Sequence, residues 1–166
     1  MATPGDGLLH PVALVALAVL ILNDRFLKTA WPGAATGKLS DVAGLIVAPL
    51  ALQGGWEVVA WANGRWTGPS SRVLGVATVL VGIGFVAIQV PGPAVDAYRF
   101  GLGVLQWPFA ALAAVITANA LPPISPVAAT PDLADLLALP ALGLAWWVGR
   151  QRSGRREPGG IGVAGH

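Results

Sequence analysis

The sequence predicts an all-α integral membrane protein, a helical bundle with four or five transmembrane helices. Of its 166 residues, 55% are hydrophobic and only 11% are charged, and the mean hydropathy is +0.68. A typical soluble domain carries about 25% charged residues, and a soluble protein this apolar would expose large apolar patches to water. The length fits a single transmembrane domain, which we place at residues 1–150.

Strongly apolar segments define the expected helices. A helix needs about 20 residues to cross the hydrocarbon core, and it satisfies its own backbone hydrogen bonds there. The first apolar run ends at Leu22 and is too short on its own, so we expect that helix to continue through Lys28. The sequence therefore predicts spans at about 8–28, 39–62, 72–90 and 132–149.

A fifth segment at 102–121 has two interpretations. It is long and apolar enough to cross the membrane, but Gln106, Pro108 and Asn119 also fit a re-entrant or interfacial hairpin. Small residues recur every four positions, as they do where helices pack closely in lipid, and this favours a packed helix without requiring a crossing. These small residues are Ala110, Ala114 and Ala118.

The cations indicate the orientation. A basic run follows the last apolar segment, which is the positive-inside signature of a cytoplasmic end, and residues 151–166 look like a disordered basic cytoplasmic tail. With five crossings and the N-terminus outside, only Arg65 and Arg72 lie outside. With four crossings, Arg65, Arg72 and the tail lie inside, and four cations lie outside. The rule therefore favours five. Those four cations are Arg25, Lys28, Lys38 and Arg99.

Several classes of site are excluded or disfavoured by composition. The pI of about 9.7 reflects a net charge of only +2 and the clustered tail arginines, so we expect a lipid bilayer and a membrane-protein partner and no nucleic acid. The absence of cysteine excludes disulfides and thiolate sites. The histidines, His10 and His166, are too few for a histidine metal cluster, so we expect no metal and no cofactor.

The first polar cluster ends the first predicted span. It contains Asn23, Asp24 and Lys28. Asp24 precedes Lys28 by four residues, which is the favourable order for a helical ion pair. The pair is either a stabilising feature of the helix end, which we favour, or part of a functional site near the membrane surface.

The second cluster precedes the second span. Thr36 or Ser40 is an N-cap candidate, and Asp41 would then lie near the positive end of the helix dipole. This explanation leaves Lys38 unaccounted for, because a cation is disfavoured at a helix start. The Gly-Lys pair lacks the remaining residues of a phosphate loop, so we reject a nucleotide site.

The third cluster precedes the last span. Thr130 as N-cap, Pro131 at the first helical position and Asp132 in the first turn are typical of a helix start. Asp135 lies three residues further on the same face. The two carboxylates either cap the helix, which we favour, or bind a cation or share a proton.

Two further kinds of residue lie within the spans. Glu57 has tryptophans near it on both sides in the sequence, and we expect its side chain to reach the membrane interface. Pro49 and Pro140 are expected inside the second and last spans, where each frees a backbone carbonyl and kinks its helix.

Motifs at both ends of the chain are similar to those of a group of small bacterial polytopic membrane proteins of uncharacterised function. They are Asn-Asp at 23–24, Lys28, the Thr-Gly-Lys-Leu-Ser-Asp string at 36–41 with Gly44 and Pro49, and the 135–140 stretch. The resemblance implies a polytopic protein of a bacterial cell membrane and no known activity.

Two classes of function follow. In the first, which we favour, the protein is a structural or accessory membrane component and its charged pairs fix helix packing. In the second, the polar clusters form one site for a ligand, an ion or membrane-embedded hydrolysis. That site would use Asn23, Asp24, Lys28, Lys38, Asp41, Asp132 and Asp135. The sequence does not decide whether the protein is an enzyme.

Overall fold

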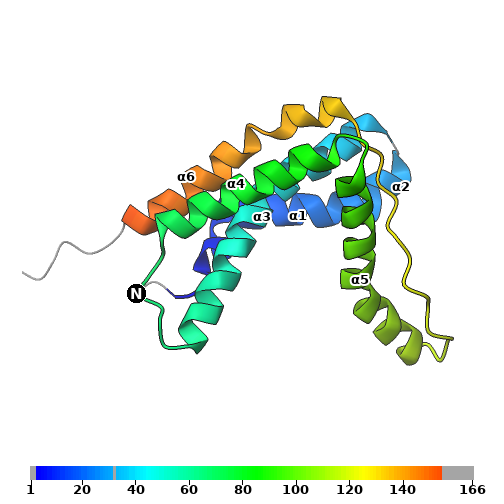
Figure 1. Ribbon diagram of the computed structural model, residues 1–166, viewed down its shortest axis with the longest axis horizontal. Helices are drawn as coiled ribbons and strands as arrows, with labels where there is room; N and C mark the ends of the chain where they lie inside the picture. Colours follow the sequence, from blue (N-terminus) through cyan, green and yellow to red (C-terminus); the bar gives the residue numbers. More distant parts are fainter. Residues whose placement is uncertain (1–2, 32, 155–166) are drawn as a thin grey trace, which may run out of the picture. The chain divides into compact units, whose positions relative to one another are not determined.

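The computed structural model describes residues 3–31 and 33–154, and this part of the chain is helical, with no strand (Figure 1). Four helical segments are long and apolar enough to cross a membrane, which confirms the predicted all-α membrane fold. They are Ala35–Ala62, Ser71–Ile88, Pro93–Ile116 and Leu133–Arg152. The chain forms two compact units: Met1–Val81 together with Ala138–His166, and Gly82–Leu137.

The first helical stretch begins with a 3-10 turn, η1 (Asp6–Leu9), and α1 (Pro11–Leu22). The His10 side chain accepts the Val12 N–H, and Pro11 occupies the first turn, where its missing N–H costs nothing. The helix does not stop at Leu22. It continues through a π-helical turn, η2 (Asn23–Leu27), and a final turn, α2 (Lys28–Ala30), so the expected continuation through Lys28 is confirmed.

The second helix, α3 (Ala34–Ala62), begins earlier than predicted, because Ala34 and Ala35 favour helix and extend it ahead of residue 39. Pro49 lies inside α3 and is buried there, as expected. The next helix, α4 (Ser71–Ile88), agrees with the predicted span at 72–90.

The last predicted span is divided at its proline. A 3-10 turn, η3 (Leu133–Ala138), precedes α6 (Ala141–Gly154), and Pro140 lies in the turn between them. Pro140 therefore lies inside the last span, as expected, and it interrupts the helix there, because a proline cannot donate the backbone hydrogen bond that would join the two pieces. The start of the expected disordered tail, 151–154, belongs to α6, and residues 155–166 lie outside the described residues.

Small and branched residues form the core of the first unit, where α1, α3, α4 and α6 meet. Its fully buried members are Ala13, Leu50, Leu74, Ala145 and Val148. A Cβ added at Gly149 would overlap the Leu74 side chain, so α4 and α6 approach closely here. Between helices in lipid, close packing of this kind replaces the hydrophobic effect as the source of association.

The two ends of the first unit meet. Arg152 in α6 forms an ion pair with Asp6 in η1, which places both residues on the same side of this unit. The two predicted layouts, with four and with five crossings, both stay predictions.

The second unit consists of helix α5 and the extended segment that follows it and runs back along it. After α5 (Pro93–Ile116), Ala118 takes a left-handed conformation with φ of 53°, which ends the helix. The following chain is extended and lies along α5: the Val127 N–H donates to the Arg99 carbonyl at 3.0 Å, and Trp107 Nε1 donates to the Pro122 carbonyl at 2.8 Å.

This excursion closes on itself. The Asp132 N–H donates to Gln89 Oε1 at 3.1 Å, so the chain that leaves α4 returns to the same place before η3 begins. The returning segment carries Pro122, Pro123 and Pro126. Extended backbone of this kind is tolerated at membrane depth only against protein or water. Helix α5 covers most of 102–121 and is itself long and apolar enough to cross a membrane, so both interpretations of this segment, a crossing and a hairpin, stay predictions.

The closest approach in the second unit gives a test of the hairpin. A Cβ at Gly103 would overlap the Ser125 carbonyl oxygen, which cannot rotate away, whereas a Cβ at Gly101 meets nothing within 4 Å. We expect Gly103→Ala to lower the free energy of unfolding in detergent by about 1–3 kcal/mol. Gly101→Ala, the matched control, should raise it by up to about 1 kcal/mol through helix propensity. Equal effects of the two substitutions would contradict the packing of the return segment on α5.

Candidate functional site

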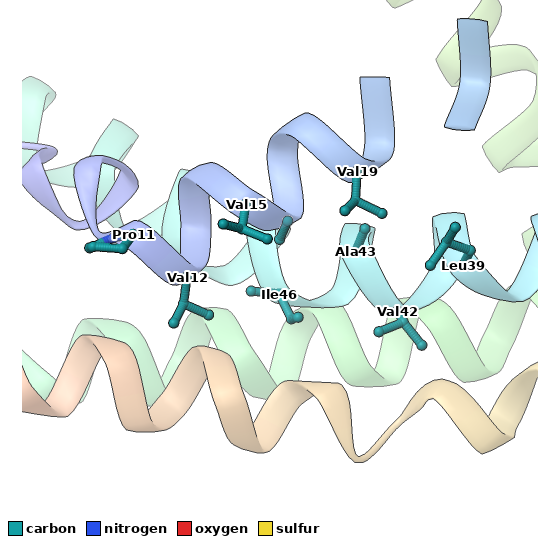
Figure 2. A pocket seen from close by; sticks show the side chains of 9 residues that line it. Pro11, Val12, Val15, Val19, Leu39, Val42, Ala43 and Ile46 are labelled. Atoms are coloured by element: carbon teal, nitrogen blue, oxygen red, sulfur yellow. The ribbon is translucent and has the colours of Figure 1, made fainter. Parts of the chain in front are cut away.

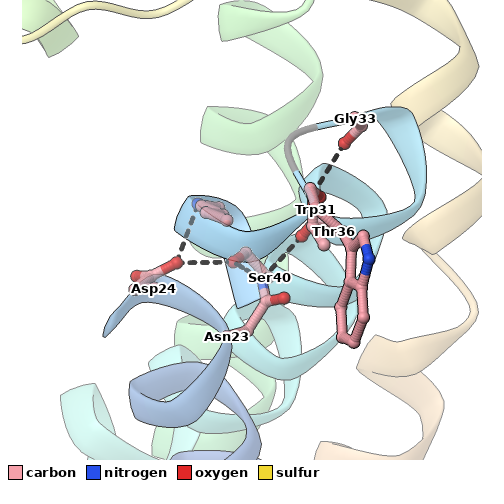
Figure 3. Close-up of polar contacts among 7 residues, drawn as sticks. Asn23, Asp24, Trp31, Gly33, Thr36 and Ser40 are labelled. Carbon is pink, nitrogen blue, oxygen red and sulfur yellow. Dashed lines mark hydrogen bonds and ion pairs between the residues drawn. The ribbon is translucent and has the colours of Figure 1, made fainter. Parts of the chain in front are cut away.

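The structure joins the first two predicted clusters into one network, the α1–α3 polar junction, which comprises Asn23, Asp24, Lys28, Thr36 and Ser40 (Figure 3). Asn23 is fully buried, and its Nδ2 donates to the Thr36 carbonyl at 2.6 Å and to Ser40 Oγ at 2.7 Å. Ser40 Oγ in turn donates to Asp24 Oδ1 at 2.7 Å. A hydrogen-bonded chain therefore runs from the buried amide to the exposed carboxylate.

The π-helical turn explains how this network forms. It places Asn23 toward α3 and leaves Asp24 about half exposed, where Lys28 Nζ lies 2.7 Å from its Oδ1. The predicted pair of Asp24 and Lys28 is thus confirmed. Single π turns inside α-helices recur at functional sites, and this one is needed to aim an amide into a helix interface.

The expected N-cap of α3 is wrong. Neither Thr36 nor Ser40 caps the helix, because α3 already begins at Ala34. Thr36 Oγ1 instead donates back to the Gly33 carbonyl at 2.8 Å and to the Trp31 carbonyl at 3.3 Å, which fastens the start of α3 to the preceding chain (Figure 3). Thr36 and Ser40 therefore serve the junction and leave capping to the backbone.

Two further predicted residues lie on the same part of α3. Lys38 and Asp41 follow Thr36 within the first turns of the helix, so Lys38 is near a helix start after all. Both take part in interactions of their own within the protein.

The third cluster belongs to the second unit. Asp132 Oδ1 accepts the Ala134 N–H at 2.8 Å, so Asp132, rather than Thr130, caps the 3-10 turn η3. Asp135 lies in the first turn of η3, where a negative charge meets the positive end of the turn. The predicted capping role is thereby confirmed for Asp132. Asp132 is the residue just before the helical turn, whereas the sequence predicted it within the first turn. The single site that combined all three clusters is not formed within the first unit, because Asp132 and Asp135 are not part of it.

The most buried charges of the first unit were not predicted as site residues. Glu57 in α3 is 2% exposed, and its Oε2 accepts the Gly5 N–H at 2.9 Å and lies 3.3 Å from Arg152 Nη2. Arg152 also pairs with Asp6. We name Asp6, Glu57 and Arg152 the buried ion cluster. It connects the N-terminal turn, α3 and α6.

Glycines allow the chain to close over this cluster. A Cβ on Gly54 would lie 3.3 Å from the Gly5 Cα, and a Cβ on Gly7 would overlap the Arg152 guanidinium. Gly5 itself has φ of 78°, a conformation that residues with side chains rarely adopt. The glycines at the N-terminus are therefore needed to bring the backbone against Glu57.

The Glu57 side chain is buried within the first unit, and its expected position at the membrane interface stays a prediction. One full turn earlier on α3, Gln53 is also fully buried, and neither its Nε2 nor its Oε1 has a hydrogen-bond partner among the described residues. A signal was present in the sequence, because an ionisable residue in an apolar span is by default a candidate functional or paired residue. Neighbouring tryptophans suggested exposure, but the partner that buries Glu57 comes from the opposite end of the chain.

An apolar groove of about 390 Å³ lies between α1 and α3 (Figure 2). Valines and an isoleucine line it, including Val12, Val15, Val42 and Ile46. A groove without polar groups offers nothing to orient a polar substrate. It is a surface suited to lipid chains.

The described residues contain no group of three or more His, Cys, Asp or Glu side chains arranged to hold a metal ion. His10 is used as a helix cap and packs edge-on against Trp147, with ring centroids 6.4 Å apart. Comparison of the chain with protein-family models, with curated proteins and with solved structures gives no significant match.

The buried ion cluster makes a double-mutant cycle informative. Arg152→Met leaves Glu57 without its cation, so we expect the free energy of unfolding in detergent to fall by about 3–5 kcal/mol. Glu57→Gln keeps an acceptor for the Gly5 N–H, and the double variant Glu57→Gln with Arg152→Met should recover at least half of the loss. Strictly additive effects in this cycle would show that the two groups are not paired.

Proposed function

We propose that this protein is a structural or accessory component of a bacterial cytoplasmic membrane. The observation that carries the proposal is the burial of Glu57 beside Arg152 and Asp6, because it uses the deepest charges of the first unit to hold three segments of one chain together. A buried charge without a partner is strongly destabilising, so these groups have a structural requirement of their own.

The α1–α3 polar junction supports the same role. Its buried amide, Asn23, bonds to the backbone and the hydroxyl of another helix, and its acid, Asp24, bonds to Ser40 and Lys28. Hydrogen bonds between helices in lipid typically contribute about 1 kcal/mol each. Polar groups at both ends of the first unit are thus used for helix association, as an accessory protein requires.

A ligand- or ion-binding function, in transport or membrane-embedded hydrolysis, is the alternative. One observation favours it: Asn23 Oδ1, Glu57 Oε1 and both polar atoms of Gln53 are buried without a hydrogen-bond partner among the described residues. Buried acceptors of this kind suit a small cation or a proton donor. The structural role is favoured because the charged atoms beside them are already paired.

The proposed orientation puts both ends of the chain in the cytoplasm. Arg150 and Arg152 begin the basic run that continues in the sequence with Arg155 and Arg156, and cations of this kind are retained on the cytoplasmic side. We propose that the lipid bilayer and another membrane protein are its partners, and that it binds no nucleic acid. The resemblance to small bacterial polytopic membrane proteins supports the same location.

Stability and phenotype together test the proposed role. Asn23→Ala leaves the Ser40 hydroxyl and the Thr36 carbonyl without their buried donor, so we expect it to cost about 1–3 kcal/mol. Asp24→Asn, its neighbour and matched control, removes an exposed charge and should cost less than about 1 kcal/mol. If the role is structural, the phenotype of a strain carrying each variant should follow its melting temperature in detergent. An Asp24→Asn protein of unchanged stability that reproduces the deletion phenotype would contradict the proposal and favour ligand binding.

Single cysteines test the orientation, since the sequence contains none. Thr3, Ala35 and Asn63 are all exposed, and α3 separates the last two. With an impermeant maleimide on intact cells, we expect labelling at Ala35→Cys, whereas Thr3→Cys and Asn63→Cys should label only after permeabilisation. Labelling of Thr3→Cys and Ala35→Cys from the same side would contradict this proposed orientation.

A further inference from the structure

A small polar pocket lies where α3 ends and the chain turns into α4. Its volume is about 160 Å³, and its lining includes Glu57 from α3, Arg65, Trp66 and Thr67 from the turn, and Ser70 just before α4. The lining therefore includes residues that carry carboxylate, guanidinium, indole and hydroxyl groups. None of the roles described above uses this pocket.

Two buried polar atoms belong to its lining residues. Glu57 uses Oε2 for the Gly5 N–H and Arg152, while its Oε1 has no hydrogen-bond partner among the residues described. Trp66 Nε1 is likewise buried without an acceptor in the same part of the chain. A buried donor or acceptor left unpaired costs about 1–3 kcal/mol. Two residues that line the pocket thus each carry one unpaired polar atom, an acceptor on Glu57 and a donor on Trp66.

The charges of the pocket have both signs. Glu57 is an acid with one oxygen already paired with Arg152, and Arg65 adds a cation to the lining of the pocket. A ligand that matches both charges carries a positive group with N–H donors and a negative group with acceptor oxygens. A single small ion of either sign would match only one of them.

An apolar groove of about 350 Å³ shares part of its wall with the pocket. Trp56 and Val73 line both, and the groove then follows α4 past Val76 to Leu80, opposite Leu52 of α3. From Val73 to Leu80 the helix rises about 10 Å at 1.5 Å per residue. A polar pocket joined to an apolar groove has the shape of a headgroup with its chain.

The depth of the pocket also fits a headgroup. Glu57 lies nine residues, about 14 Å, from the middle of α3. Half of the hydrocarbon core is about 15 Å thick. With α3 centred in the bilayer, Glu57 is therefore at the level where hydrocarbon gives way to headgroups, and Trp56 and Trp66 beside it occupy typical aromatic-belt positions.

We propose that this pocket and groove bind a phospholipid whose headgroup carries a primary ammonium, of the phosphatidylethanolamine class. The ammonium donates to Glu57 Oε1, the phosphate accepts from the Trp66 indole N–H and pairs with Arg65, and an acyl chain lies in the groove along α4. The inference rests on the membrane location of the protein and is independent of the proposed structural role.

Lipid titrations with the purified full chain test this assignment. Delipidated protein in detergent is mixed with dioleoyl phosphatidylethanolamine, phosphatidylcholine or phosphatidylglycerol, and bound lipid is counted by native mass spectrometry. Phosphatidylcholine has no N–H donor and phosphatidylglycerol has no cation, so we expect both to bind at least about tenfold more weakly, as loss of one hydrogen bond to a charged group implies. Equal affinities for the three lipids would overturn the proposal.

Two substitutions, one in the pocket and one in the groove, test where the lipid binds. Trp66→Phe removes only the indole N–H, and Val76→Trp fills the groove from a position that is 55% exposed. Each should weaken phosphatidylethanolamine binding about tenfold. Trp61→Phe and Val79→Trp are the matched controls, since both residues are exposed and line neither cavity, and both should bind like the wild type. If either Trp66→Phe or Val76→Trp keeps wild-type affinity, the proposed site is wrong.

Discussion

A charge inside an apolar bundle must find its counter-charge within the protein, and the rest of the first unit is arranged around that constraint. Glu57 on α3 is 2% exposed, and it is compensated by Arg152 at the end of α6, which also pairs with Asp6 before α1. In a medium without water, the penalty for separating these groups is several kcal/mol. The cluster therefore fixes which helix ends lie together in this unit.

At the other end of the first unit, α1 and α3 are joined by hydrogen bonds of a buried neutral amide instead of an ion pair. Asn23 is a neutral amide that reaches α3 because one π-helical turn redirects the helix, and the charges of Asp24 and Lys28 stay half exposed beside it. A neutral donor can be buried at lower cost than an ion. The first unit thus has a charged connection at one end and a hydrogen-bonded connection at the other, with small apolar residues between them.

The second unit obeys a backbone constraint instead. Its extended return segment cannot satisfy its own hydrogen bonds, and prolines reduce the number that it must satisfy. The remaining contacts are made to α5, through Arg99 and Trp107, while Gly103 lets the two chains approach. Gln89 and Asp132 close the excursion, because the Asp132 N–H donates to Gln89 Oε1.

The sequence by itself determined the fold class, the approximate positions of the helices and the local polar pairs. Hydropathy over about 20 residues identifies helices in lipid because they alone satisfy their backbone there, and spacing predicted the pair of Asp24 and Lys28 because four residues make one turn. Local capping rules were less successful, since Thr36 and Ser40 bond to other segments. Only the tertiary structure decided the pairing of Arg152 with Asp6, the return of the chain along α5 and the burial of Glu57. Each of these depends on contacts between residues far apart in the chain, such as Asp6 and Arg152, and no local pattern in the sequence records which distant charge will meet which.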